Sequence, residues 1–191
     1  MSRKWMIVSL MAVLALSFSA AAFAQAPAHL IVGAEKGCKM CHQGVAKGDQ
    51  FKIWSESSHA KAFAALATPE AIEVGKKLGI AEPQKDPKCL ECHTTKAFLK
   101  AEAGAAYVEA EGVGCEGCHG AGSDYKAMAV MKDKAKAVAA GLVMPDEKTC
   151  LKCHNEKSPT YKPFKYAEAL KVIAHPKPAA PAAPATPATG G

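Results

Sequence analysis

All eight cysteines of this 191-residue chain fall into four pairs that share one spacing. Two residues separate the cysteines of each pair, and a histidine directly follows the second cysteine. The pairs are Cys38/Cys41, Cys89/Cys92, Cys115/Cys118 and Cys150/Cys153, and the histidines that follow them are His42, His93, His119 and His154. No cysteine is left over, so this repeat constrains the fold at four points along the chain.

The pattern C-x-x-C-H is the attachment signature of haem c. Two thiols about one helical turn apart reach both vinyl groups of one porphyrin, and the next residue turns its imidazole toward the iron. The sequence therefore predicts four covalently bound haem c groups, held through the eight cysteines, with the four motif histidines as proximal iron ligands.

Three other uses of paired cysteines explain the pattern less well. Structural zinc sites of this kind use two C-x-x-C pairs for each metal, and disulfides are common in exported chains. Neither accounts for a histidine after every pair. Thioredoxin-like redox pairs normally occur singly in a strand–helix context, which this sequence lacks.

Three histidines remain as second axial ligands, because four of the seven belong to the motifs. His59 follows a serine cluster that is typical of a helix start, and His175 closes an apolar-faced helix just before Pro176. His29 lies a few residues inside the mature N-terminus, close to the first motif. We predict all three as distal iron ligands.

One iron then lacks a histidine on its second side. Met128 and Met131 share a face of a helix predicted after the third motif, and methionine is an accepted axial ligand in cytochromes c. We therefore predict Met128 as the fourth distal ligand, with Met131 and Met144 next in order and Met40 a weaker candidate. The alternative that this iron stays five-coordinate is open.

The two ends of the chain predict export and a flexible tail. Arg3 and Lys4 precede an apolar run that ends in a small-residue cleavage site, so residues 1–24 are predicted to be a signal peptide. Residues 176–191 are almost entirely Pro, Ala, Thr and Gly, a composition that cannot bury enough apolar surface to fold. Residues 25–175 are then one tetrahaem domain without an integral membrane span, located in the periplasm, at the cell surface or outside the cell.

Composition indicates an unusual core. The net charge of +6 falls to 22 basic against 18 acidic residues once the signal peptide is removed, and haem propionates would cancel much of that excess, so we predict no nucleic-acid partner. Only two Trp, four Tyr and six Phe are present, a thin supply for a side-chain core. The haem groups are expected to replace much of it, which predicts a largely unfolded apo-protein.

Three segments extend the motifs into a longer pattern: Trp54–His59 after the first motif, the glycine-rich run at 114–123 around the third, and Ile173–Pro176 after the fourth. Together they resemble the cytochrome c-554 family over most of residues 30–176. The resemblance implies a mainly helical chain wrapped around closely packed haems, mostly with two histidine ligands. Family members often carry a histidine shortly after the glycine-rich run, where this chain has Asp124 and Tyr125.

The predicted fold class is mainly α with little regular structure, wrapped around four closely packed haems. Helices are predicted at residues 56–66, 69–78, 124–140 and 166–174, and a weak strand at 107–110. Helix caps are predicted at Thr68 and Ser123. The spacing between His93 and His119 is the shortest between motif histidines, which predicts that those two haems are neighbours.

The predicted function is electron transfer between redox protein donors and acceptors, without an enzymatic reaction. A haem enzyme with one open iron that acts on a small nitrogen oxide or peroxide is one alternative. A subunit of a conductive filament is another, in which His29 or His175 crosses to a neighbouring copy. A homo-oligomer is therefore among the open alternatives.

Overall fold

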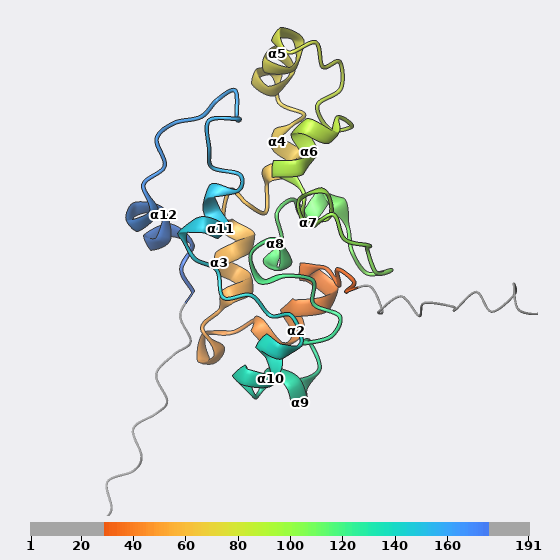
Figure 1. The fold of residues 1–191 in the computed structure, drawn as a ribbon, viewed down its shortest axis with the longest axis vertical. Coiled ribbons are helices and arrows are strands. Elements are labelled where there is room, and N and C mark those ends of the chain that lie inside the picture. Colours follow the sequence, from red (N-terminus) through yellow and green to blue (C-terminus); the bar gives the residue numbers. More distant parts are fainter. Residues whose placement is uncertain (1–28, 176–191) are drawn as a thin grey trace, which may run out of the picture.

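The computed structural model describes residues 29–175. The predicted signal peptide and the predicted tail lie outside these residues. The described chain forms short helices joined by turns and loops (Figure 1). In chain order they are η1 (Ala34–Cys38, a π-helix), α2 (Lys39–His42), η2 (Val45–Lys47, a 3-10 helix), α3 (Gln50–Glu56), α4 (Ala62–Ala65), α5 (Pro69–Lys77), α6 (Pro87–His93), α7 (Thr95–Leu99), η3 (Glu109–Glu111, a 3-10 helix), α8 (Cys115–His119), α9 (Met128–Met131), α10 (Lys134–Ala139), α11 (Glu147–Leu151) and α12 (Tyr166–Ile173).

Regular structure is sparse. The described residues form no strand, and one isolated parallel bridge joins Ile31 to Ala103, next to a 2.9 Å bond from Ile31 N to Glu102 O. The expected fold class, mainly α with little regular structure, is confirmed. The weak strand predicted at 107–110 is wrong, because the chain turns into η3 there. No helix within residues 29–175 combines the length and the apolar character that crossing a bilayer requires.

Two helices match their predictions. Helix α5 begins at Pro69, and the Thr68 side chain accepts a 3.2 Å hydrogen bond from Ala71 N, as an N-cap should. Gly79 follows this helix with a φ of 71°, a left-handed conformation that glycine adopts at little cost. Helix α12 covers the segment predicted to end at residue 174.

The continuous helix predicted at 56–66 is wrong, because the chain forms α3 and α4 with a turn between them. The Ser57 hydroxyl donates to Trp54 O at 2.6 Å and so closes α3 where a helix start was predicted. The His59 carbonyl accepts from Val113 N at 3.0 Å, a partner more than fifty residues away. This tertiary hydrogen bond replaces one that a continuous helix would form locally.

The helix predicted at 124–140 is also wrong, because it is divided into α9 and α10. Ser123 does not cap a helix, since its hydroxyl accepts from Leu30 N at 2.9 Å. Asp133 instead caps α10, accepting from Ala135 N at 3.1 Å and Lys136 N at 3.2 Å. An aspartate that caps in this way favours a new helix start over continuation of the preceding helix.

Side chains alone build a small core. Nine apolar residues of the described chain are buried, whereas fourteen large apolar residues are exposed. One buried cluster joins Phe51 and Trp54 of α3, whose rings lie 5.4 Å apart, to Ala34 of η1. Trp54 Nε1 also donates to Val113 O at 2.8 Å, which ties α3 to the segment before α8. The side-chain core is therefore small, and the expectation that haem groups replace much of it stays a prediction.

Two carboxylates dock the segment before the first motif onto the third motif. Glu116 lies within α8 and is only 2% exposed. Its carboxylate accepts from the backbone N–H groups of Val32 at 2.8 Å, Gly33 at 2.8 Å and Gly122 at 2.6 Å. A second carboxylate, that of Glu111, accepts a hydrogen bond from Ala34 N at 2.7 Å. The N-terminal segment is therefore held in place by charge-assisted hydrogen bonds.

Helix α8 lies near the middle of the molecule in Figure 1, and α7 and η1 pack against it. Helix α5 projects at the top of that view, while α9 and α10 lie at the bottom. The third C-x-x-C-H motif, which forms α8, thus stands at the centre of the fold.

Candidate functional site

Each of the four motifs, numbered in chain order, occupies a short helix or the turn that follows one. Motif 1 crosses from η1 into α2, motif 2 ends α6, motif 3 is α8, and motif 4 begins in α11. Helices α2, α6 and α8 end at His42, His93 and His119. The two cysteines of each motif are consequently separated by about one turn, the spacing that the attachment chemistry needs. All eight cysteines lie within the described residues, and none of them forms a disulfide.

Cys41 differs from the other motif cysteines in its surroundings. Cys41 is exposed, whereas the other seven motif cysteines are partly buried. The reason is that α2, which carries Cys41, contributes no buried residue to the described core, and Met40 beside it is 79% exposed. The role of Cys41 in haem attachment stays a prediction.

Local capping sets where two motif helices begin. Asp86 accepts from Lys88 N at 2.8 Å at the start of α6, and Pro87 occupies its first turn. Asp146 and Thr149 form a capping box at α11. Local hydrogen bonds therefore fix where the helices that carry motifs 2 and 4 begin.

The ring nitrogens of three predicted ligands are oriented by backbone carbonyls. His93 Nδ1 lies 2.7 Å from Ala62 O, and His119 Nδ1 lies 3.0 Å from Val143 O. His175 Nδ1 lies 2.8 Å from the carbonyl of Ile173. A carbonyl accepts a hydrogen bond from Nδ1–H, so the proton of the neutral ring stays on Nδ1 and the Nε2 lone pair is left for a metal.

Two of the predicted distal histidines face a motif histidine. The ring centroids of His59 and His154 lie 6.0 Å apart, and those of His119 and His175 lie 6.1 Å apart. Two imidazoles that bind one metal from opposite sides, each with a metal–nitrogen distance of about 2 Å, place their centroids roughly 6 Å apart. Both pairs therefore fit the axial spacing of a metal held between two histidines.

Burial keeps these imidazoles neutral. Burial lowers the pKa of His59, and the nearby His154 lowers it further. Burial also lowers the pKa of His119 and of His154. The neutral ring is the form that binds a metal, so this environment suits axial ligation.

Cysteine contacts show which motifs are neighbours. The Cys115 thiol lies close enough to Cys38 to interact with it and, together with burial, raises the pKa of Cys38. Burial raises the pKa of Cys153, and the adjacent Cys92 adds to this effect. Motif 1 therefore lies beside motif 3, and motif 2 beside motif 4. The expectation that the haems of motifs 2 and 3 are neighbours stays a prediction.

The other two predicted distal ligands are placed differently. His29 Nδ1 lies 2.9 Å from Asp124 Oδ2, and its side chain is 59% exposed. Met128 begins the one-turn helix α9 and is 63% exposed. Among the aromatic ring contacts of residues 29–175, no second imidazole faces His42 or His93. The assignments of His29 and Met128 stay predictions.

Sequence reasoning missed two residues that support this region. Glu116 occupies a variable position of motif 3, where the motif itself demands nothing, and only the docked N-terminal segment explains its burial. Asp124 stands where members of the family that the chain resembles often carry a histidine, and it contacts His29. The sequence does not predict this contact, and the aspartate at this position is the one feature that could have suggested it.

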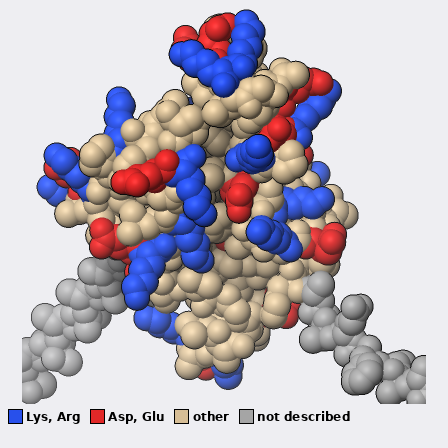
Figure 2. Space-filling model, turned by 45° about the horizontal axis from the view of Figure 1, so that its top comes forward, with Lys and Arg blue, Asp and Glu red and all other residues tan. Residues whose placement is uncertain are grey.

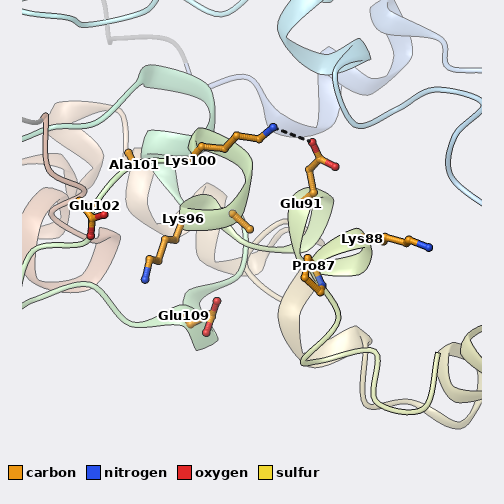
Figure 3. A pocket seen from close by; sticks show the side chains of 9 residues that line it. Pro87, Lys88, Glu91, Lys96, Lys100, Ala101, Glu102 and Glu109 are labelled. Atoms are coloured by element: carbon orange, nitrogen blue, oxygen red, sulfur yellow. Dashed lines mark ion pairs between the residues drawn. The ribbon is translucent and has the colours of Figure 1, made fainter.

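A cavity of about 580 Å³ lies beside α6 and α7 (Figure 3). Six of the residues that line it are charged: Lys88, Glu91, Lys96, Lys100, Glu102 and Glu109. Lys100 reaches across to Glu91, with a distance of 3.9 Å between Nζ and Oε1. Its lining, drawn from the described residues, contains no cysteine or histidine, but it includes Glu91, which stands between the two cysteines of motif 2, so the cavity borders that motif.

Lysines and acidic side chains are mixed on the molecular face shown in Figure 2. Several lysines of the described chain form ion pairs with nearby acidic side chains, as Lys39 does with Glu35 at 2.8 Å and Lys76 with Glu73 at 2.6 Å. Such intermixed charge differs from the continuous basic surface that nucleic-acid binding favours.

C-x-x-C-H motifs on short helices, in a mainly helical chain with little regular structure, define the class of c-type cytochromes. Comparison with known proteins narrows the class to a family. Residues 37–120, somewhat less than half of the chain, match the family model described as "Cytochrome c554 and c-prime". The match includes motifs 1 to 3, whereas motif 4 lies beyond it.

One curated relative is the protein named cytochrome c-554 from Nitrosomonas europaea. The two chains are 31% identical over 100 residues, which is 48% of this chain and 39% of the relative. The aligned stretch thus spans well under half of the relative's length. No solved structure matches the chain.

Proposed function

We propose that this protein is an exported tetrahaem c-type cytochrome that carries electrons between redox proteins. The observation that carries the proposal is the spacing of the imidazoles in the pairs His59/His154 and His119/His175. Each pair joins one motif histidine to one histidine outside the motifs, as axial ligation of a motif-bound haem requires. The match of residues 37–120 to a cytochrome family model supports the same conclusion.

The cofactor in this proposal is haem c, which supplies a one-electron redox couple when bound. The eight motif cysteines attach the four groups, and His42, His93, His119 and His154 are the proximal ligands. His59 ligates opposite His154, and His175 opposite His119. The carbonyls of Val143 and Ile173 orient His119 and His175, so that both present Nε2.

The proximity of the motifs supports a relay role. Contacts between Cys38 and Cys115 place motif 1 beside motif 3, and Cys118 lies near Cys150 of motif 4. Cys92 and Cys153 connect motif 2 to motif 4. We propose the order 1–3–4–2, in which motif 4 stands between motifs 2 and 3, in place of the direct contact of those two haems that the short spacing of His93 and His119 predicts. Electrons that enter at either end of this series travel in short steps. The donor and acceptor are redox proteins, and the predicted signal peptide directs the chain to the periplasm or beyond.

Cys41 keeps its attachment role in this proposal although it is exposed. A thiol must be accessible to react with a vinyl group, so exposure is compatible with thioether formation. Cys38, the other thiol of motif 1, lies toward Cys115 of motif 3. Cys38 and Cys41 would hold the haem of motif 1 and would supply a redox centre next to motif 3 at one end of the proposed series.

A second function follows from the two histidines that face no second imidazole. If the iron at His42 or His93 keeps an open position, the protein binds a small molecule there and acts on a nitrogen oxide or peroxide. Met128, whose side chain is 63% exposed at the start of α9, is the side chain proposed to close such an iron. Carbon monoxide binding distinguishes the two cases, because a six-coordinate iron binds it poorly.

The haem count tests the proposal directly. The mature protein, made in cells with a working cytochrome maturation system, should gain the mass of four haem groups. Serine variants that remove one motif at a time should each lose one group. Intact mass spectrometry checks both results, and a mature chain without added porphyrin would refute the proposed function.

Removal of a distal histidine should open one iron. We expect His59→Ala and His175→Ala each to convert one low-spin iron per chain to a high-spin form that binds carbon monoxide. Electron paramagnetic resonance and optical spectra measure this change. Ser58→Ala, at an exposed neighbouring position, is the control and should leave every iron low-spin as in the wild type. Spectra of the histidine variants that match the wild type would exclude the paired assignments.

A further inference from the structure

His29 is the first described residue, yet the segment that begins with it is firmly held. Leu30 N donates to Ser123 Oγ at 2.9 Å, and Ser123 N donates back to Leu30 O at 3.1 Å. The next residues bond to the buried carboxylate of Glu116. The backbone of His29 is therefore fixed against the loop that follows motif 3.

The imidazole of His29 has a defined partner on one side. Asp124, which follows Ser123, places Oδ2 2.9 Å from His29 Nδ1. A neutral imidazole that donates Nδ1–H to this carboxylate keeps the Nε2 lone pair free. Histidines that ligate metals commonly donate their other N–H to a carboxylate, which fixes the tautomer and raises the basicity of the ligand.

The imidazole ring of His29 also has a defined position next to motif 3. A Cβ atom on Gly141 would lie 3.8 Å from Cε1 and Nδ1 of His29, so the ring packs against this glycine. Two residues further on, the Val143 carbonyl orients the ring of His119. The ring of His29 thus packs against the loop whose Val143 carbonyl orients His119.

The two other non-motif histidines already face a motif histidine, which leaves His29 as the histidine available for another iron. Resting on the proposed function, we propose that Asp124 is a positioning residue that holds His29 as the axial ligand of an iron at His42 or His93. Asp124 acts through His29 and does not touch the iron.

The test uses the holoprotein and three variants. His29→Ala should add one high-spin, carbon monoxide-binding iron per chain, and added imidazole should restore the low-spin spectrum. Asp124→Asn should keep His29 but weaken its bond to the iron, since loss of such a partner typically weakens metal ligation about 10- to 100-fold, and carbon monoxide should then displace His29 more readily than in the wild type. Asp124→Glu, which keeps the carboxylate, should remain close to the wild type.

Asp133→Asn is the matched control, because Asp133 is about as exposed as Asp124, at 43% against 38%. Its contacts are with Lys136 and with the backbone at the start of α10, where asparagine also serves as a cap. An unchanged spectrum in His29→Ala would overturn the proposal, and so would an Asp124→Asn variant that behaves like the control. If His29→Ala does not accumulate, the Asp124 variants decide the question. Intact mass is measured for every variant, so a missing haem, which contradicts the proposed function, is distinguished from a haem with an altered ligand.

Discussion

A chain whose eight motif cysteines are replaced by serine is expected to lose most of its helical circular dichroism and its cooperative unfolding transition. The longest described helix, α5, has nine residues, and isolated helices shorter than about 12 residues are marginal in water. The nine buried apolar residues offer little tertiary support. Because a group that binds only the folded state stabilises that state, loss of the proposed haem groups should shift the equilibrium strongly toward the unfolded chain.

The control for this experiment is the wild-type sequence made with and without the maturation system, which separates loss of haem from any effect of serine itself. The haem-free wild type should be as disordered as the serine variant. A haem-free chain that melts cooperatively with near-native helix content would contradict the prediction, and would show that side chains alone specify the fold.

Glu116→Gln is expected to lower the free energy of unfolding by about 2 kcal/mol, within the range for a buried donor left without its acceptor. Both carboxylate oxygens of Glu116 accept backbone N–H groups, whereas glutamine turns an amide donor toward one set of them. The segment that carries His29 should therefore detach from motif 3. Denaturant titration measures the change, and hydrogen exchange at Val32 and Gly33 locates it.

Glu109→Gln provides the matched control, because Glu109 is exposed in η3 and its substitution should cost almost nothing. A pH series adds a second check. Burial raises the pKa of Glu116, so the stability that this group contributes is largest below the ordinary glutamate range and falls as pH rises through the raised value. The difference between wild type and Glu116→Gln should narrow from acid to neutral pH. Equal stability of the two proteins at every pH would exclude a structural role for the carboxylate.

Much of the site can be read from the chain, because haem attachment is a local chemistry. Each motif needs only two thiols and an imidazole within one turn, and a sequence displays that spacing directly. Helix α5 was predictable for the same reason, since Thr68, Pro69 and Gly79 act on their immediate neighbours. Mainly α structure with few long elements follows from motifs that interrupt the chain at such short intervals.

Pairing between distant segments was not predictable to the same degree. The helix predicted through His59 fails because the carbonyl of that residue bonds to Val113, and the helix after Ser123 fails because Ser123 bonds to Leu30. No spacing rule relates these residues. The exposure of Cys41 was hidden for the same reason, since burial of a thiol depends on which segments pack over it.

The amino-acid sequence by itself determined the four C-x-x-C-H motifs, where haem attachment is predicted, and the imidazole that follows each pair of thiols, because these residues are neighbours along the backbone. The tertiary structure alone decided that His59 and His175 face His154 and His119, that Asp124 meets His29, and that Glu116 is buried under the N-terminal segment. These contacts join residues far apart in the chain. Their geometry depends on how short helices pack against one another, and local spacing carries no information about that packing.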